Sequence, residues 1–153
     1  MNDAASDTRE IVVEEVFPHA PETIWKTLTN GELMARWLGM TPTGFEPVKG
    51  KQFTYQTTPG GAWDGVIRCE VLEVIPNQRL VYSWKGGHEQ NVGYGAPLDT
   101  VVTFTLARVE NGTRLRAVHS GFVLPRNETA FKNMGDGWKK VVPRIGAMAG
   151  EQD

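Results

Sequence analysis

The sequence has only one cysteine, Cys69, among 153 residues, which excludes an intrachain disulfide. No apolar run approaches the ~18 residues that a membrane-spanning helix needs, so we expect no membrane segment. Neither sign of charge dominates, because 16 basic and 18 acidic side chains leave a net charge of −2. This balance argues against nucleic acid as a partner. The N-terminus lacks the basic and apolar regions of a signal peptide, and we therefore expect a cytoplasmic protein.

Motifs for the common chemistries are also missing. The sequence contains no G-x-S-x-G, no H-E-x-x-H, no C-x-x-C and no P-loop. Its three histidines, His19, His88 and His119, lie at no spacing typical of metal ligands. We therefore expect neither a metal nor another cofactor.

The chain is long enough for one domain with a real core. Residues 1–8 are small and polar and predict a flexible tail, whereas residues 9–150 predict a single domain. Charge is uneven along the chain: residues 1–35 carry seven acidic and two basic side chains, and residues 108–144 carry eight basic and three acidic ones. We expect these two segments to meet and neutralise each other; the alternative is a basic patch for an anionic partner.

The N-terminal part predicts one strand and two short helices. Residues 10–17 are β-branched and apolar, which favours a strand. Pro21 opens a helix that ends at Asn30-Gly31. A second short helix is expected from Glu32 to Leu38, with Gly39 as its C-terminal cap.

From residue 44 onward the apolar period is two, which predicts antiparallel strands joined by short turns. We expect these strands near residues 50–58, 63–75, 79–86, 99–109 and 113–122. One connection, from Gly86 to Pro97, is long and glycine-rich. It is either a slack hairpin or a mobile flap over a site.

A long amphipathic helix should follow, with Asn127 as its N-cap and Gly150 as its end. Pro143 lies inside the helical pattern and should bend the helix or start its final turns afresh. The apolar residues that share one face are Phe131, Met134, Trp138, Val141, Val142, Ile145 and Met148. This helix must lie across the apolar face of the sheet, with the two short helices filling one end. The sequence thus predicts an α+β fold with a cavity where the curved sheet and the helix diverge.

Six short pieces of sequence, in this order, resemble one known superfamily. They are FPHAPETIW at 17–25, LTN and WLG at 28–30 and 37–39, VLEVIP with RLVYSW at 71–76 and 79–84, GTRL at 112–115, HSGF at 119–122, and Gly137-Trp138. The pattern, over about residues 10–149, resembles the SRPBCC superfamily with its helix-grip (START-like, Bet v 1-like) fold. Within it, the chain is similar to the family of the activator of heat-shock-protein-90 ATPase.

The resemblance implies a curved antiparallel sheet of about six strands around a long C-terminal helix, with two short helices after the first strand. It also implies a small hydrophobic molecule as partner, held between sheet and helix. Some superfamily relatives are polyketide cyclases or aromatases. Relatives that stimulate the chaperone carry an additional N-terminal domain, for which we expect no room in this chain, so a chaperone partner is not expected. A homodimer stays open.

His119 is the main candidate for polar chemistry. Alternation along Leu115, Ala117 and His119 places its ring on the apolar face of a strand. One interpretation is a buried histidine held by a hydroxyl or a backbone carbonyl; the other is a ligand anchor or a general acid. Hydroxyls of Tyr82, Thr103 and Thr105 would then complete a proton path.

The aromatic residues suggest a roomy site, although plain core packing is the alternative for each of them. The candidate ligand-binding residues are Trp63, Ile67, Tyr82, Trp84, Thr103, His119, Phe122, Phe131, Met134 and Trp138. The first hypothesis is a binder of a small hydrophobic or aromatic molecule. The second is an enzyme of cyclase, dehydratase or hydrolase type with His119 as its catalytic residue. The third is a chaperone-regulating interaction protein that uses the basic segment 108–144.

Overall fold

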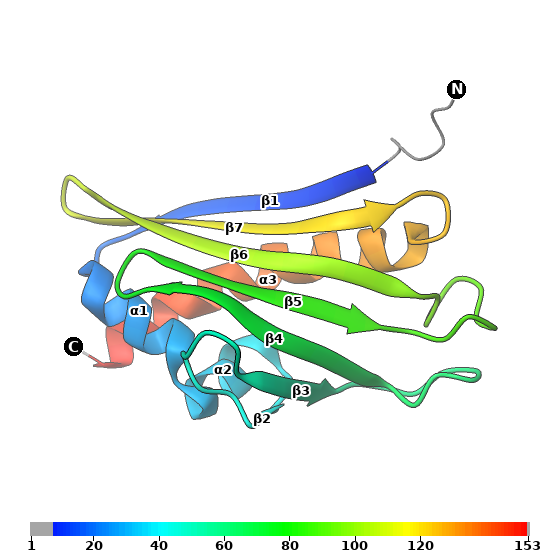
Figure 1. The fold of residues 1–153 in the computed structure, drawn as a ribbon. Helices are drawn as coiled ribbons and strands as arrows, with labels where there is room; N and C mark the ends of the chain where they lie inside the picture. The colour runs from blue at the N-terminus through cyan, green and yellow to red at the C-terminus, as the bar shows by residue number, and fades with distance from the viewer. Residues whose placement is uncertain (1–7, 153) are drawn as a thin grey trace.

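The strands alternate buried and exposed side chains, which is why they assemble into a sheet with one covered face. The computed structural model describes residues 8–152 (Figure 1). Its strands are β1 (Thr8–Phe17), β2 (Pro42–Thr43), β3 (Gln52–Gln56), β4 (Val66–Ile75), β5 (Arg79–Gly86), β6 (Leu98–Val109) and β7 (Gly112–Val123). The short β2 was not predicted, because two residues are too few to show the alternation of apolar and polar side chains that marks a strand. Of the tail predicted for 1–8, residues 1–7 lie outside the described residues.

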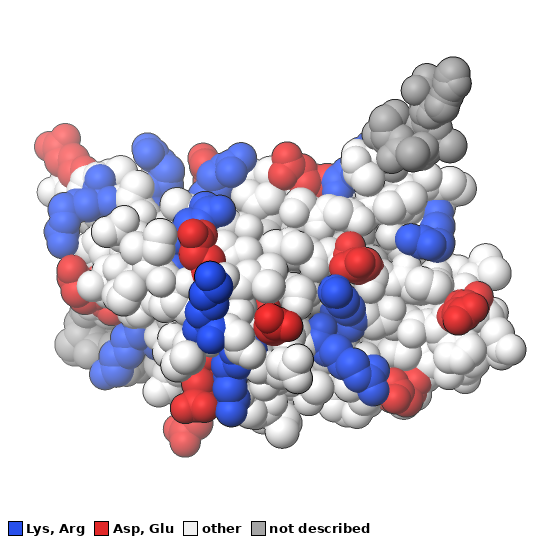
Figure 2. Space-filling view, viewed as in Figure 1, with Lys and Arg blue, Asp and Glu red and all other residues white. Residues whose placement is uncertain are grey.

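All seven strands form one antiparallel sheet in the order β1-β7-β6-β5-β4-β3-β2. Strand β1 therefore pairs with β7, which brings the acidic N-terminal segment beside the basic segment, as predicted. Arg116 lies 3.3 Å from Glu14, and Arg108 lies 3.5 Å from Glu22. Figure 2 shows the face of the sheet turned away from the long helix, where acidic and basic side chains are interspersed. These exposed ion pairs add little stability, but they neutralise the basic segment locally.

The two short helices form where the sequence predicts them. Helix α1 (Pro21–Thr29) begins at Pro21, and helix α2 (Gly31–Leu38) ends at Gly39, which adopts a left-handed conformation with φ of 86°. Asn30 separates them, and its Oδ1 accepts a hydrogen bond of 3.1 Å from the N–H of Leu33. Both helices fill one end of the space between the sheet and the C-terminal part of the long helix (Figure 1).

The long helix α3 (Glu128–Gln152) lies across the concave face of the sheet (Figure 1). It runs through Pro143 without a break and past Gly150, so the final turns do not start afresh at Pro143 and the predicted end at Gly150 was wrong. The bend at Pro143 stays a prediction. Proline has no N–H, so one backbone carbonyl in the preceding turn lacks its helical hydrogen bond. Because Pro143 is exposed, water can bond to that carbonyl instead. Asn127 does not cap the helix through its side chain. Its Nδ2 donates to the carbonyl of Pro97 at 2.7 Å, and its Oδ1 accepts from the N–H of Val123 at 2.8 Å.

One apolar core fills the space between sheet and helices. It includes the fully buried residues Trp37, Phe104, Leu115, Val142 and Ile145. Cys69 belongs to this core, and burial raises the pKa of its thiol, as suits an inert residue. Within residues 8–152, no helix is long and apolar enough to cross a bilayer.

Candidate functional site

A bulge in β7 turns two aromatic rings toward α3. Glu10 of β1 pairs with Ser120 and Arg9 pairs with Phe122, which leaves Gly121 unpaired. Gly121 has φ of 104°, a conformation that glycine adopts without strain. The extra residue shifts the alternation, so that His119 and Phe122 both face the core. Their ring centroids lie 4.7 Å apart.

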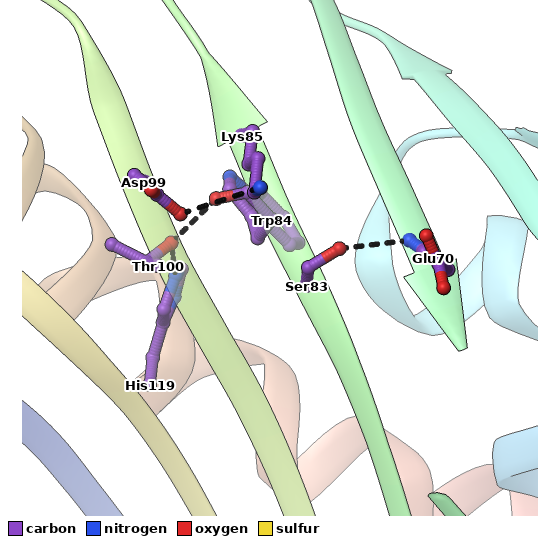
Figure 3. A network of polar contacts seen from close by, with 7 residues as sticks. All are labelled: Glu70, Ser83, Trp84, Lys85, Asp99, Thr100 and His119. Atoms are coloured by element: carbon purple, nitrogen blue, oxygen red, sulfur yellow. Dashed lines mark hydrogen bonds and ion pairs between the residues drawn. The ribbon is translucent and has the colours of Figure 1, made fainter. Parts of the chain in front are cut away.

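His119 is buried, and both of its ring nitrogens have partners. Trp138 on α3 donates its Nε1–H to Nδ1 of His119 at 3.0 Å. Nε2 lies 2.7 Å from Oγ1 of Thr100, and that hydroxyl donates to the backbone carbonyl of Trp84 at 2.8 Å (Figure 3). An indole N–H can only donate and a carbonyl can only accept. The chain of bonds therefore runs in one direction, from Trp138 through the imidazole and Thr100 to the carbonyl of Trp84.

This direction fixes the histidine as a neutral ring with its proton on Nε2. Burial lowers the pKa of His119 to about 3, because the positive form would lose its hydration. The ring is thus a neutral element of the core that ties the helix to the sheet.

From the sequence, the hydroxyls of Thr103 and Thr105 were expected to be partners of His119, but the threonine that contacts its ring is Thr100. Residues 98, 100, 102, 104 and 106 of β6 face α3, whereas Thr103 and Thr105 alternate with them and lie on the outer face. The prediction for Thr103 was therefore wrong, because it did not fix which face of the strand the sheet buries. Tyr82 does face the core, and its hydroxyl lies 3.4 Å from that of Tyr55. Burial raises the pKa of both phenols, so neither is a ready proton donor at neutral pH.

An apolar cavity of about 250 Å³ lies between the N-terminal half of α3 and the sheet. It is lined by residues of α2, β4, β5, β6, α3 and the loops next to them: Leu38, Met40, Thr57, Trp63, Ile67, Trp84, Gly86, Gly87, Tyr94, Gly95, Ala96, Leu98, Ala130, Asn133, Met134, Gly137, Trp138 and Val141. No acidic, basic or histidine side chain is among them. Such a wall suits an uncharged apolar guest.

Two loops meet at one side of this cavity. Asn91, in the loop of residues 87–97, donates to the carbonyl of Gly60 at 2.7 Å and accepts from the N–H of Ala62 at 2.9 Å. The ring of Tyr94, in the same loop, packs at a tilt against Trp63, with 5.7 Å between ring centroids, and its hydroxyl donates to the carbonyl of Thr58. The glycine-rich connection is therefore held against the loop of residues 57–65, and together the two loops cover part of the cavity.

The described residues hold no group of three or more His, Cys, Asp or Glu side chains that could bind a metal ion.

A family model described as activator of Hsp90 ATPase homolog 1-like protein matches residues 18–150. The chain belongs to this family. Protein MLL2253 from Mesorhizobium loti, a crystal structure, is 36% identical with a TM-score of 0.80, and the match covers 95% of this chain and 99% of that one.

Two less similar structures share the fold of this chain. CalU16 from Micromonospora echinospora is 23% identical, with a TM-score of 0.69 over 92% of this chain and 74% of that one. The Aha1 dimer from Colwellia psychrerythraea is 21% identical, with a TM-score of 0.66, and the match covers 90% of this chain and 93% of that one. No curated protein matches the chain. The α+β helix-grip fold expected from the sequence is confirmed.

The structure divides the predicted site residues into three groups. Five line the cavity: Trp63, Ile67, Trp84, Met134 and Trp138. Tyr82, His119, Phe122 and Phe131 lie outside its wall, packed in or against the core. Thr103 lies on the other face of the sheet.

Sequence reasoning missed several residues of the wall, among them Met40, Tyr94, Ala96 and Gly137. Met40 and Tyr94 lie in irregular segments with no period to place them. The glycine-rich composition of residues 86–97 was the available signal for the second loop.

Proposed function

We propose that this protein binds a small hydrophobic or aromatic molecule in the cavity between α3 and the sheet, in the cytoplasm. The fold supports a ligand-binding or polyketide-cyclase-like role in general terms. The observation that carries the more specific proposal is the wall of the cavity, which combines three indoles, from Trp63, Trp84 and Trp138, with no charged side chain. A cytoplasmic location fits the single unpaired thiol of Cys69.

Apolar burial would supply most of the binding free energy, at about 25 cal/mol per Å² less the cost of ordering the ligand. Indole rings provide large, rigid contact surfaces at little entropic cost. Met134 adds a flexible wall that adapts to the shape of the guest. Gly137 keeps the helix side of the cavity open, because a Cβ built there meets no other atom within 4 Å.

Titration with N-phenyl-1-naphthylamine, an uncharged dye that fluoresces in apolar surroundings, tests the proposal. We expect a saturable rise in dye fluorescence together with a change in tryptophan emission. Gly137→Leu should fill the cavity and weaken binding at least tenfold. Gly135→Leu is the matched control, because Gly135 is on the same helix, has equal space around it and does not line the cavity. Absence of saturable binding to the unaltered protein would refute the proposal.

The enzymatic alternative with His119 as its catalytic residue has less support. Both ring nitrogens are occupied within the protein, and the ring does not line the cavity. A chaperone-regulating role based on the segment 108–144 is also weakened, because Arg108 and Arg116 face carboxylates of α1 and β1. A homodimer stays a prediction that sedimentation velocity would test; the Aha1 protein from Colwellia psychrerythraea is a dimer.

A further inference from the structure

The three tryptophans of the cavity wall differ in what their indole N–H groups bind. Trp63 donates to the carbonyl of Val66 at 3.2 Å, and Trp138 donates to Nδ1 of His119 at 3.0 Å. The N–H of Trp84 is buried and has no acceptor. Within residues 8–152 it is the one buried side-chain nitrogen or oxygen without a partner.

A buried donor without an acceptor costs about 1–3 kcal/mol, so native proteins rarely leave one unpaired. The indole of Trp84 cannot easily turn to find a partner, because aromatic rings surround it. Its centroid lies 5.4 Å from Tyr55, 5.1 Å from His119 and 6.4 Å from Trp138. Its backbone carbonyl is held by Thr100. The donor is therefore held in place on a residue that lines the cavity.

We propose that the ligand of this cavity is an uncharged molecule with an acceptor oxygen, such as an aromatic ketone or quinone, and that this oxygen accepts the hydrogen bond of Trp84 Nε1–H. The inference rests on the proposed function and adds the chemical class of the ligand. A carboxylate or phosphate is disfavoured as the acceptor, because no cationic side chain lines the cavity to pair with it. A pure hydrocarbon would fill the space but leave the donor unpaired.

The volume limits the size of this molecule. A cavity of about 250 Å³ lies just below the range of roughly 300–1,000 Å³ typical of ligand pockets. A compact skeleton of two or three fused rings fits this cavity volume better than a long chain or a sterol. The rigid wall of indoles also favours a planar guest.

A matched pair of probes separates the hydrogen bond from apolar burial. 9-Fluorenone and fluorene share one tricyclic skeleton, and only the ketone carries an acceptor oxygen. We expect fluorenone to bind the unaltered protein about tenfold more tightly in tryptophan-quenching titrations, although fluorene is the more hydrophobic molecule. In ¹H–¹⁵N spectra, the indole resonance of Trp84 should move downfield with fluorenone and much less with fluorene.

Two variants complete the test. Trp84→Phe keeps an aromatic ring but removes the free donor, and it should abolish the preference for fluorenone. Trp63→Phe removes a cavity indole whose N–H is already used, and it should keep the preference. The spectra of the unaltered protein decide the matter even if Trp84→Phe fails to fold.

The outcomes distinguish the two proposals. If both probes bind with equal affinity and the Trp84 resonance responds equally to each, binding in the cavity stands, but the assigned acceptor is refuted. That result would mean that the donor serves a water molecule. If the preference for fluorenone persists in Trp84→Phe, the inference is likewise refuted. If neither probe binds, the proposed function is refuted and the inference with it.

Discussion

The indole N–H of Trp138 donates to Nδ1 of His119 at 3.0 Å, which joins α3 to the centre of the sheet by a buried polar contact. The contact continues through Thr100 to the backbone of β5, so one chain of hydrogen bonds connects the helix with three neighbouring strands. The imidazole is the link that can accept from one side and donate to the other only while it is neutral. Protonation would therefore break the contact at Nδ1.

Stability should consequently depend on pH through His119. Its pKa is lowered to about 3 in the folded protein, compared with about 6.5 in an unfolded chain. Between these values the unfolded state binds more protons, so stability is fully present above about pH 6.5 and is lost as the pH falls. From pH 7 to pH 5, urea unfolding should show a loss of about 2 kcal/mol. In His119→Gln this loss should largely disappear; an unchanged loss would contradict the prediction.

The hydroxyl of Thr100 should matter far more than that of Thr103. Thr100→Val keeps the shape of the side chain but leaves Nε2–H of His119 without its partner, which should cost about 1–3 kcal/mol of unfolding free energy. Thr103→Val makes the same chemical change on the outer face of the same strand, and its free energy of unfolding should stay within about 0.5 kcal/mol of that of the unaltered protein. Equal effects of the two variants, measured by denaturant unfolding, would show that the bond to His119 contributes little.

Two glycines of α3 should respond in opposite ways to alanine. A Cβ at Gly146 would overlap the ring of Phe17, where the helix crosses the end of β1, so Gly146→Ala should destabilise by about 1–3 kcal/mol. A Cβ at Gly135 meets nothing within 4 Å, and Gly135→Ala should stabilise by about 1 kcal/mol through helix propensity. Thermal unfolding of both variants checks the pair. A stabilised Gly146→Ala protein would mean that the ring of Phe17 moves aside freely.

The two loops over the cavity should loosen when Asn91 is removed. Asn91→Ala loses the bonds to Gly60 and Ala62, so the amide of Ala62 should exchange its hydrogen several-fold faster. Val92→Ala is the control, because Val92 is 97% exposed and its truncation should leave that exchange rate unchanged. Equal rates in both variants would show that Asn91 does not hold the loops together.

Local sequence patterns were sufficient to predict a strand or a helix where one physical rule acts over a whole segment. The period-two alternation placed five of the seven strands, the β-branched composition of residues 10–17 placed β1, and the spacing of Phe131, Trp138 and Ile145 placed the buried face of α3. Pro21 and Gly39 marked helix boundaries because each has a backbone preference of its own. That the helix continues through Pro143 was not certain from the sequence, because the cost of an interior proline depends on whether solvent can reach the interrupted hydrogen bond.

The sequence by itself thus determined the elements, the curved sheet around one helix and the supply of aromatic residues. Only the tertiary structure decided which of those residues surround empty space. Periodicity assigns a residue to a face, but the boundary between packed core and cavity depends on contacts between segments far apart in the chain. For this reason His119, Thr100 and Trp138 became one hydrogen-bonded chain, while the buried indole N–H of Trp84, a residue that lines the cavity, has no partner.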